Sequence, residues 1–451
     1  MRLRVVTVLS LALVVVVLFA AVRAEVPKST TAPVLIYTST PRYDVTAWLQ
    51  GGERFPQRAR LMLRSNGVSH LLLPDFSASA DAELSFDGTK LLFAGKKSAT
   101  DHWQIWEVSL PKGEPKQLTA CASDCVRPFY LPDERFVYAR KIDGFFRIEA
   151  APFDGGKALQ LTYVPGNVLP TDVLHDGRVL FEASYPLGAG DTAELYTVYP
   201  DGSGVESYRC DHGDSRYSGR QVSSGDIVFV NDRGLGRFTS PLAHELQIAA
   251  PQGEFAGDIA QLSEDKWIVS WRADAQQHYS LREWNQITNG SSSLVAEEGS
   301  DAVQPRLASA REVPNRFPSA LHDWTGANVL CLNTYTSKLK IANGSVESVQ
   351  LYTQNAGKPE LLGRAQVERD GSFFLHVPSD RPIQIELLDR SGNTVQREQG
   401  WFWMRQGEQR VCVGCHAGPE RAPENAVPQV LVKSTDPVDM TRSLANETGG
   451  R

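Results

Sequence analysis

A pattern of strands and tight turns repeats along residues 33–310, and it limits the fold more than any other feature of this sequence. The stretch DAELSFDGTKLLFAGKKSATDHWQIWEVSLPKGEPKQLT (81–119) is typical of four short strands joined by Asp-Gly and Lys-Gly turns. Residues 126–162 repeat this order and end on the same QLT, and similar units begin at residues 169, 218 and 256. Internal repeats of this kind indicate an architecture before any single motif does.

The repeat length, roughly 40 to 45 residues with four strands per unit, is typical of a β-propeller. A further unit at 32–74 raises the count to six, and DAVQPRLAS (301–309) resembles an opening strand without its partners. Closing such units into a ring removes exposed sheet edges. We therefore predict an all-β fold that begins with a six-bladed β-propeller at 33–310, with five or seven blades as alternatives. The SFDGTKLLF-type repeats resemble those of TolB-like periplasmic propellers.

The pattern changes after residue 310. Alternating strands with a DGS turn (370–372) and an RSGN turn (390–393) predict a small β-sandwich-like domain at 318–406. The segment 407–451 contains several prolines, so we expect irregular chain there, suited to wrapping a cofactor. An aromatic run, Trp401-Phe402-Trp403, precedes this segment and is a candidate wall for an apolar cofactor.

The first residues have the layout of a secretory signal. Arg2 and Arg4 precede an apolar run from Val5 to Val22, and small residues lead to a cleavage site near Ala24. We predict a signal peptide at 1–24 and a periplasmic or otherwise extracytoplasmic protein. The run is long enough that an uncleaved membrane anchor is the alternative. If the signal is cleaved, we expect no integral membrane span.

The segment RVCVGCHAGP (410–419) carries the clearest chemical motif. Cys412, Cys415 and His416 form Cys-x-x-Cys-His, the attachment motif of c-type haem. In such sites the two thiols bond covalently to the porphyrin, and the histidine is delivered to the iron. A thioredoxin-type redox pair and half of a zinc site are the alternatives. We predict one covalent haem c.

Two other cysteines, Cys121 and Cys125, are separated by three residues. Outside the cytoplasm thiols tend to pair, so we expect a disulfide between them. The formal net charge is −7 and no basic stripe is present, so nucleic acid is not an expected partner.

The order of these parts resembles a known family. A propeller is followed by CLNTYTS (331–337), by DGSFFLHVPSDRPIQIELLDRSGNTV (370–395) and by WFWMRQGEQRVCVGCH (401–416). This order resembles the first two thirds of the α subunit of hydrazine synthase, most specifically over 325–428. The resemblance implies a hydrazine-synthase-alpha middle domain with a haem site.

The same resemblance implies unusual ligands. In that family a tyrosine shortly after the motif binds the iron, and the motif histidine and a cysteine from the start of the domain face a zinc ion. Cys331 matches that cysteine, but Glu420 stands four residues after His416 and no tyrosine follows Tyr352. A second haem motif of the family has no counterpart in this sequence. We therefore expect a single-haem protein with this architecture.

The ligand assignment stays open at this point. We expect His416 to bind the haem iron, with zinc shared by His416 and Cys331 as the alternative. Met440 and Glu420 are further candidate iron ligands. The expected function is periplasmic electron transfer or small-molecule redox chemistry with an unidentified redox partner. The alternative is a non-catalytic binding or sensing module that docks a protein on the propeller, and the sequence does not decide whether the protein is an enzyme.

Overall fold

The structure is a computed structural model that describes residues 33–56, 58–184, 192–209, 214–241, 243–355, 357–398, 400–415 and 425–441. The predicted signal peptide lies outside these ranges. Among the described residues, no helix has the length and apolar character needed to cross a membrane.

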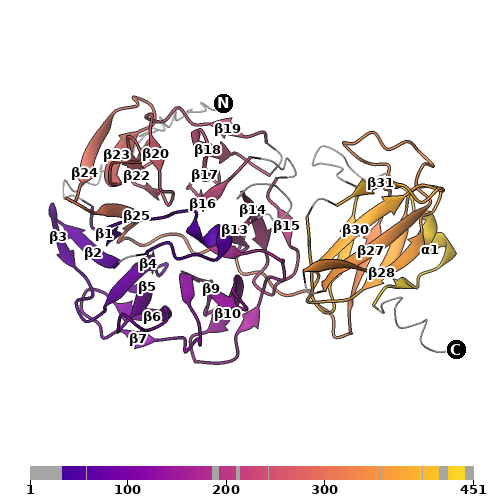
Figure 1. The fold of residues 1–451 in the computed structure, drawn as a ribbon, viewed down its shortest axis with the longest axis horizontal. Helices are drawn as coiled ribbons and strands as arrows, with labels where there is room; N and C mark the ends of the chain where they lie inside the picture. The colour runs from indigo at the N-terminus through magenta and orange to yellow at the C-terminus, as the bar shows by residue number, and fades with distance from the viewer. Residues whose placement is uncertain are drawn as a thin grey trace, which may run out of the picture. The chain divides into compact units, whose positions relative to one another are not determined.

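Six sheets, each built around four strands, form a propeller and are arranged around a common centre (Figure 1). The predicted all-β, six-bladed propeller is thereby confirmed. In chain order, blade 2 contains β4 (Ala78–Leu84), β5 (Lys90–Lys96), β6 (Gln104–Ser109) and β7 (Lys116–Gln117). Blade 3 contains β8 (Cys125–Tyr130), β9 (Arg135–Ile142), β10 (Phe145–Pro152) and β11 (Leu159–Gln160). Blade 4 contains β12 (Val168–Val173), β13 (Val179–Ser184), β14 (Ala193–Val198) and β15 (Glu206–Ser207).

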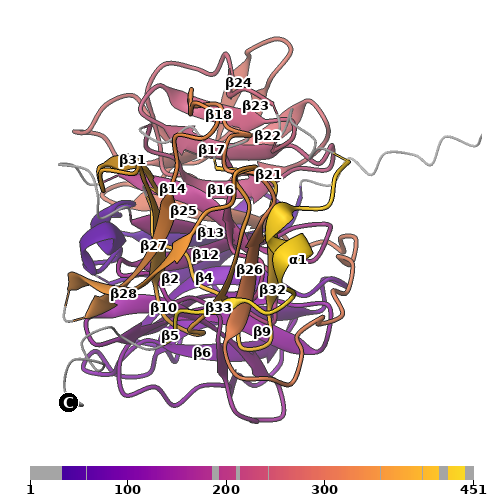
Figure 2. The same ribbon diagram turned by 90° about the vertical axis from the view of Figure 1, so that its right-hand side faces the viewer.

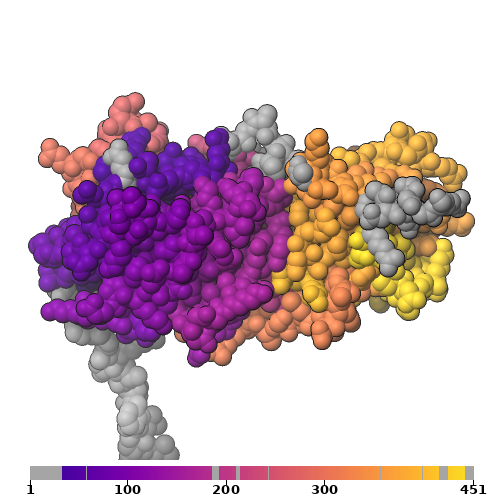
Figure 3. All heavy atoms as spheres, turned by 60° about the horizontal axis from the view of Figure 1, so that its bottom comes forward, coloured from indigo at the N-terminus to yellow at the C-terminus, as the bar shows by residue number. Residues whose placement is uncertain are grey.

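The last two blades follow the same plan, with one irregular inner strand. Blade 5 contains β16 (Tyr217–Gln221), β17 (Ile227–Asn231), β18 (Gly234–Phe238) and β19 (Leu246–Gln247). Blade 6 contains β20 (Glu254–Phe255), β21 (Ala260–Gln261), β22 (Lys266–Arg272), β23 (Ser280–Asn285) and β24 (Ser291–Val295). β20 and β21 both pair with β22, so together they take the inner position. In space-filling view the blades form a continuous, closely packed surface (Figure 3).

Blade 1 closes the ring. It joins β25 (Asp301–Leu307) to β1 (Leu35–Thr40), β2 (Arg60–Ser65) and β3 (Val68–Leu71), so the two ends of the propeller chain share one sheet. The buried carboxylate of Asp301 accepts hydrogen bonds from the backbone N–H of Tyr43 at 2.7 Å and of Tyr279 at 2.8 Å. The isolated opening strand seen at 301–309 in the sequence is therefore the closing strand of the first blade.

The inner strands share a backbone feature that the repeat did not reveal. Five non-glycine residues at the centre have positive φ angles between 49° and 55°, namely Asp81, Arg127, Ser218, Asp258 and Gln304. Positive φ is strained for such residues and persists only where neighbours hold it. The backbone N–H of Asp81 donates to the Gln304 side chain at 3.2 Å, and that of Arg127 to Asp81 at 3.0 Å. The N–H of Ser218 likewise donates to Glu182 at 2.7 Å, so three of the five turned amides are held by a side chain from another blade.

Charged side chains join the blades at the same level. Asp258 lies 2.6 Å from Arg127 and 3.4 Å from Arg306, and Arg306 also lies 2.9 Å from Glu83. Burial works to raise the pKa of Asp258, but Arg127 and Arg306 outweigh it and hold this pKa below its usual value. Buried carboxylates of this kind stay ionised because each is matched by a guanidinium.

A second β-rich domain follows, made of two four-stranded sheets (Figure 2). One sheet has the order β32 (Gln409–Cys412), β26 (Ala327–Cys331), β29 (Phe373–Val377) and β33 (Val438–Asp439). The other has the order β28 (Lys358–Gln366), β27 (Ser348–Asn355), β30 (Ile383–Leu388) and β31 (Thr394–Arg397). Apolar side chains from both sheets, including those of Val329, Leu375 and Leu351, form one buried core between them.

The segment after residue 407 is more regular than the sequence predicts. β32 adds to the edge of β26 in parallel, a short helix α1 (Gln429–Lys433) follows, and β33 adds to β29. Backbone N–H and C=O groups at the edges of β26 and β29 need partners, and these late strands supply them. The prolines therefore delimit short elements rather than prevent them.

Candidate functional site

Strand pairing brings three cysteines together. Cys331 ends β26 and Cys412 ends β32, and the two residues are direct partners in the parallel register of these strands. The N–H of Leu332 donates to the carbonyl oxygen of Cys412 at 2.9 Å, which continues the pairing past the strand ends. Cys415 lies three residues further and packs against the same core. All three thiols are free.

The three cysteines line a cavity of about 390 Å³. This volume lies within the range of pockets that hold small molecules and cofactors. Aromatic and aliphatic side chains of the second domain form a large part of the remaining wall: Phe373, Ile385, Leu387, Trp401 and Phe402. The predicted aromatic wall is thus found for two of the three residues in the run.

The third aromatic residue of the run has another role. Trp403 is fully buried in the core that blades 3 and 4 share, where its Nε1–H donates to the carbonyl oxygen of Gly202 at 3.0 Å. The propeller also contributes to the wall of the cavity. Its lining residues there are Tyr196, Val205, Glu206 and Ser207. No signal in the sequence links these residues of β14, β15 and the loop between them to the cysteine motif.

Steric contacts explain why a glycine, Gly414, stands between the two motif cysteines. A Cβ atom on Gly414 would lie 2.0 Å from the carbonyl oxygen of Thr336 and 2.8 Å from that of Asn333. Both contacts are with backbone, which cannot move aside as a side chain can. The spacer of the motif is therefore pressed against the loop that follows β26, and this contact fixes where Cys412 and Cys415 meet the cavity.

Burial determines whether the three thiols are protonated. It raises the pKa of Cys331 and Cys412 above the usual range, and it raises the pKa of Cys415 to about 12. All three groups are therefore neutral thiols at pH 7, and binding a metal through any of them would release a proton.

The wall also contains polar side chains, among them Glu206, Ser207, Gln396 and Glu398, and two further polar groups bear on a cofactor. The hydroxyl of Thr334 is buried and has no hydrogen-bond partner among the described residues, although Thr334 lines the cavity. Arg410 is the single cation among the described lining residues, and its Nη2 lies 2.8 Å from Glu408. An unsatisfied buried hydroxyl is costly, so its position indicates a missing polar or covalent neighbour.

Of the other predicted site residues, Met440 lies in the part of the chain that the structure describes, and it does not line this cavity. His416 and Glu420 lie outside the described residues. Met440 is buried in the core of the second domain, where its backbone N–H donates to His376 and its side chain packs beside Gly363. Among the described residues, no group of three or more His, Cys, Asp or Glu side chains is arranged to hold a metal ion.

The remaining predicted cysteine pair lies in the propeller. Cys121 and Cys125 form a disulfide, with their Cα atoms 6.4 Å apart. Cys125 is the first residue of β8 and Cys121 lies just before this strand, so the disulfide constrains the chain where blade 3 begins. This bond has no part in the cysteine-lined cavity.

Fold and site together define a class of protein: a six-bladed propeller joined to a β-sandwich-like domain whose Cys-x-x-Cys strand lines an apolar cavity. Residues 330–417 match the family model of the hydrazine synthase alpha subunit middle domain. The hydrazine synthase subunit alpha of Kuenenia stuttgartiensis is 38% identical over 61 residues, a match that spans 14% of this chain and 8% of that protein.

One solved structure extends the similarity in fold to most of the chain. Kuenenia stuttgartiensis hydrazine synthase aligns with a TM-score of 0.78 and 16% identity, covering 89% of this chain and 72% of that chain. TolB from Acinetobacter baumannii aligns with a TM-score of 0.41 and 12% identity, covering 60% of this chain and 66% of that chain. The chain therefore resembles the hydrazine synthase alpha subunit in architecture, and its sequence similarity is concentrated in the second domain.

Proposed function

We propose that this chain is an exported c-type haem protein with a hydrazine-synthase-alpha-like architecture. Its haem is bound covalently by Cys412 and Cys415, and it acts in periplasmic electron transfer or small-molecule redox chemistry. The observation that carries this proposal is that both motif cysteines line one apolar, aromatic cavity of about 390 Å³.

The lining residues fit a porphyrin. Trp401, Phe402 and Phe373 offer an apolar surface for a macrocycle, and Arg410 offers a cation for its carboxylate groups. The buried hydroxyl of Thr334, which has no partner among the described residues, lines the same cavity and offers a hydrogen bond to a polar group of the cofactor. A redox pair or half zinc site would not require such an extended apolar wall.

The chain's own residues would perform distinct tasks there. Cys412 and Cys415 hold the group in place, and the contact of Gly414 with the Thr336 carbonyl fixes their separation from the wall. Trp401 and Phe402 exclude water, which lowers the local dielectric constant. When bound, haem supplies one-electron redox chemistry whose potential depends on axial ligands and burial.

We assign the iron to His416, since the chain has no tyrosine after the motif to replace it. One observation favours the alternative in which a zinc ion is shared by His416 and Cys331. Cys331 lies opposite Cys412 in the strand register and lines the same cavity. The two arrangements predict different metal contents.

Covalent haem is tested by expressing the full chain with a cytochrome c assembly system and staining the denatured protein for haem peroxidase activity. Wild type should stain, and the variant Cys412→Ser/Cys415→Ser should not. The matched control is Cys121→Ser/Cys125→Ser, which removes the disulfide and should retain the stain. A wild-type protein without covalent haem would overturn the proposal.

Export is tested on the same preparation by N-terminal sequencing. The mature chain should begin near Glu25 and appear in the periplasmic fraction, because residues 1–24 have the layout of a cleaved signal. An unprocessed chain in the integral membrane fraction would support the anchor instead.

A further inference from the structure

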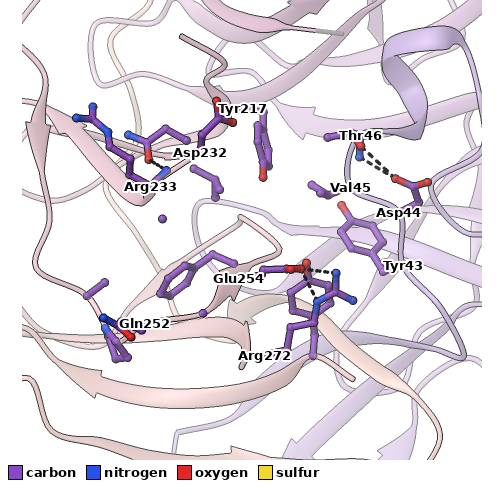
Figure 4. Close-up of a pocket in the computed structure, with 18 of the residues that line it drawn as sticks. Tyr43, Asp44, Val45, Thr46, Tyr217, Asp232, Arg233, Gln252, Glu254 and Arg272 are labelled. Carbon is purple, nitrogen blue, oxygen red and sulfur yellow. Dashed lines mark hydrogen bonds and ion pairs between the residues drawn. The ribbon is translucent and has the colours of Figure 1, made fainter. Parts of the chain in front are cut away.

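The propeller has a second cavity that shares no lining residue with the cysteine-lined one. This propeller cavity has a volume of about 670 Å³ (Figure 4). Its walls come from the segment after β1, from β16 and the turn between β17 and β18 in blade 5, and from the start of blade 6. The volume is within the range of small-molecule sites.

A carboxylate with an unused oxygen lies in this cavity. Glu254 accepts two hydrogen bonds from Arg272, at 2.8 Å from Nε and 2.5 Å from Nη2, and both end on the same oxygen, Oε2. Oε1 of Glu254 has no partner among the described residues. The Glu254 side chain is 46% exposed, whereas that of Arg272 is 9% exposed. The group that can reach a ligand is therefore the carboxylate.

Arg272 is already engaged on two sides. Its guanidinium lies 4.2 Å from the centroid of the Tyr279 ring and bonds to Glu254. Its Nη1 atom lacks a hydrogen-bond partner, but that atom is buried away from solvent. Two further arginines line the cavity. Arg233 is 3.0 Å from Glu245, which partly neutralises its charge. Arg42 donates to the carbonyl oxygen of Ala275 at 3.4 Å and makes no ion pair with any described residue.

Aromatic hydroxyls and two further carboxylates, those of Asp44 and Asp232, also line the cavity, and Asp44 accepts hydrogen bonds from the backbone N–H groups of Thr46 and Ala47. The hydroxyls of Tyr43 and Tyr217 point into the cavity and have no partner among the described residues (Figure 4). Burial raises the pKa of both phenols above the usual range, so they are neutral. Asp232 lies at the cavity beside Tyr217, is exposed, and makes no ion pair with any described residue.

We propose that the propeller cavity binds a small organic amine in its protonated, ammonium form. Glu254 Oε1 and Asp232 provide negative charge, and the phenol hydroxyls of Tyr43 and Tyr217 accept hydrogen bonds from the ammonium group. The guanidinium of Arg272 would otherwise attract an anion, but Glu254 neutralises its charge. The site is independent of haem and adds a ligand-binding function to the propeller.

The proposal is tested by calorimetric titration of the full chain with benzylamine, compared with benzyl alcohol and benzoate of the same size. Benzylamine should bind saturably, and at least about tenfold more tightly than either of the others, since only it carries a positive charge. Tighter binding of benzoate would show that Arg272 selects an anion, and equal binding of benzyl alcohol would show that charge is not recognised. Either result, or no saturation by about 10 mM benzylamine, would overturn the proposal.

Variants identify the site. Glu254→Gln should weaken benzylamine binding about tenfold or more, but it also loosens Arg272. Asp232→Asn, an exposed position without an ion pair to any described residue, should weaken binding several-fold without lowering the melting temperature. The matched control is Glu264→Gln, which neutralises an exposed carboxylate outside the cavity. Unchanged binding in Asp232→Asn and Glu254→Gln, or an equal loss in the control, would contradict the assignment.

Discussion

Cys331 and Cys412 lie directly opposite one another on the neighbouring parallel strands β26 and β32. This pairing brings a cysteine from the start of the second domain to the Cys-x-x-Cys motif near its end. Both residues line the cavity that we assign to the cofactor. The pair therefore offers a direct way to separate the two metal arrangements of this site.

Replacing Cys331 by Ser should leave the haem spectrum unchanged. We expect this because His416 is assigned to the iron, so the Cys331 thiol is not needed as a ligand. In contrast, His416→Ala should change the Soret band and the spin state. Metal analysis of the wild type should find no stoichiometric zinc. About one zinc per haem that is lost in Cys331→Ser would sink the assignment and favour the shared zinc.

Gly414→Ala should destabilise the second domain. The added methyl group would meet the carbonyl oxygen of Thr336 at 2.0 Å, so the loop after β26 or the motif has to move. Overpacking of this kind costs roughly 1–3 kcal/mol. Urea unfolding of the chain measures the loss. Gly290→Ala is the control, because Gly290 is exposed and its nearest atom is the flexible Thr288 hydroxyl at 3.2 Å. Equal stability of the two variants would contradict the steric role of Gly414.

The propeller can be predicted from the sequence because the strand and turn residues that specify each hairpin are close together in the chain and recur in every blade. Each hairpin carries its own turn residues, and even the lone segment 301–309 is recognisable as a strand. The cofactor cavity is predicted only in part. Cys412 and Cys415 are adjacent in a motif, but the wall formed by Tyr196 and Val205 comes from a blade that has no sequence link to it.

The charged centre of the propeller was also beyond prediction. Asp258 and Arg127 are far apart in the chain and meet only because the blades close into a ring. In the sequence, the segments that contain Asp258 and Arg127 have the pattern of ordinary strands with a few polar residues. The positive φ angle of Arg127 has no signature in the sequence, since such angles are expected at Gly or Asn.

Asp258→Asn should strongly destabilise the propeller. It leaves the buried guanidiniums of Arg127 and Arg306 without their shared carboxylate. Breaking a buried ion pair costs roughly 3–5 kcal/mol, whereas an exposed pair contributes at most about 1 kcal/mol. Glu283→Gln is the matched control, since Glu283 pairs with Lys266 at the surface. Similar losses in the two variants would argue against the buried ion pairs as a structural centre.

Glu182 should make folding sensitive to pH. Burial raises the pKa of Glu182 from 4.5 to about 7, and its carboxylate accepts a hydrogen bond from the Ser218 N–H at 2.7 Å. A raised pKa in the folded state gives stability below pH 4.5 that is lost as the pH rises through 7. Glu182→Gln keeps an acceptor oxygen but cannot ionise.

The stability gained by Glu182→Gln should therefore grow from pH 5 to pH 8. Denaturant unfolding of the variant and the wild type at matched pH values measures this difference in the free energy of unfolding. The titration of other groups affects both proteins equally and therefore cancels in the difference. A difference that stays flat or shrinks as the pH rises would show that Glu182 has an ordinary pKa in the folded protein.

The central claim, covalent haem at the motif, is tested most directly by mass spectrometry of the denatured protein after expression with cytochrome c assembly. The mass of the wild-type chain should increase by one haem, and the added mass should map to the tryptic peptide VCVGCHAGPER (411–421). A wild-type chain that matures without this added mass, or that carries it on another peptide, would rule out covalent haem at Cys412 and Cys415.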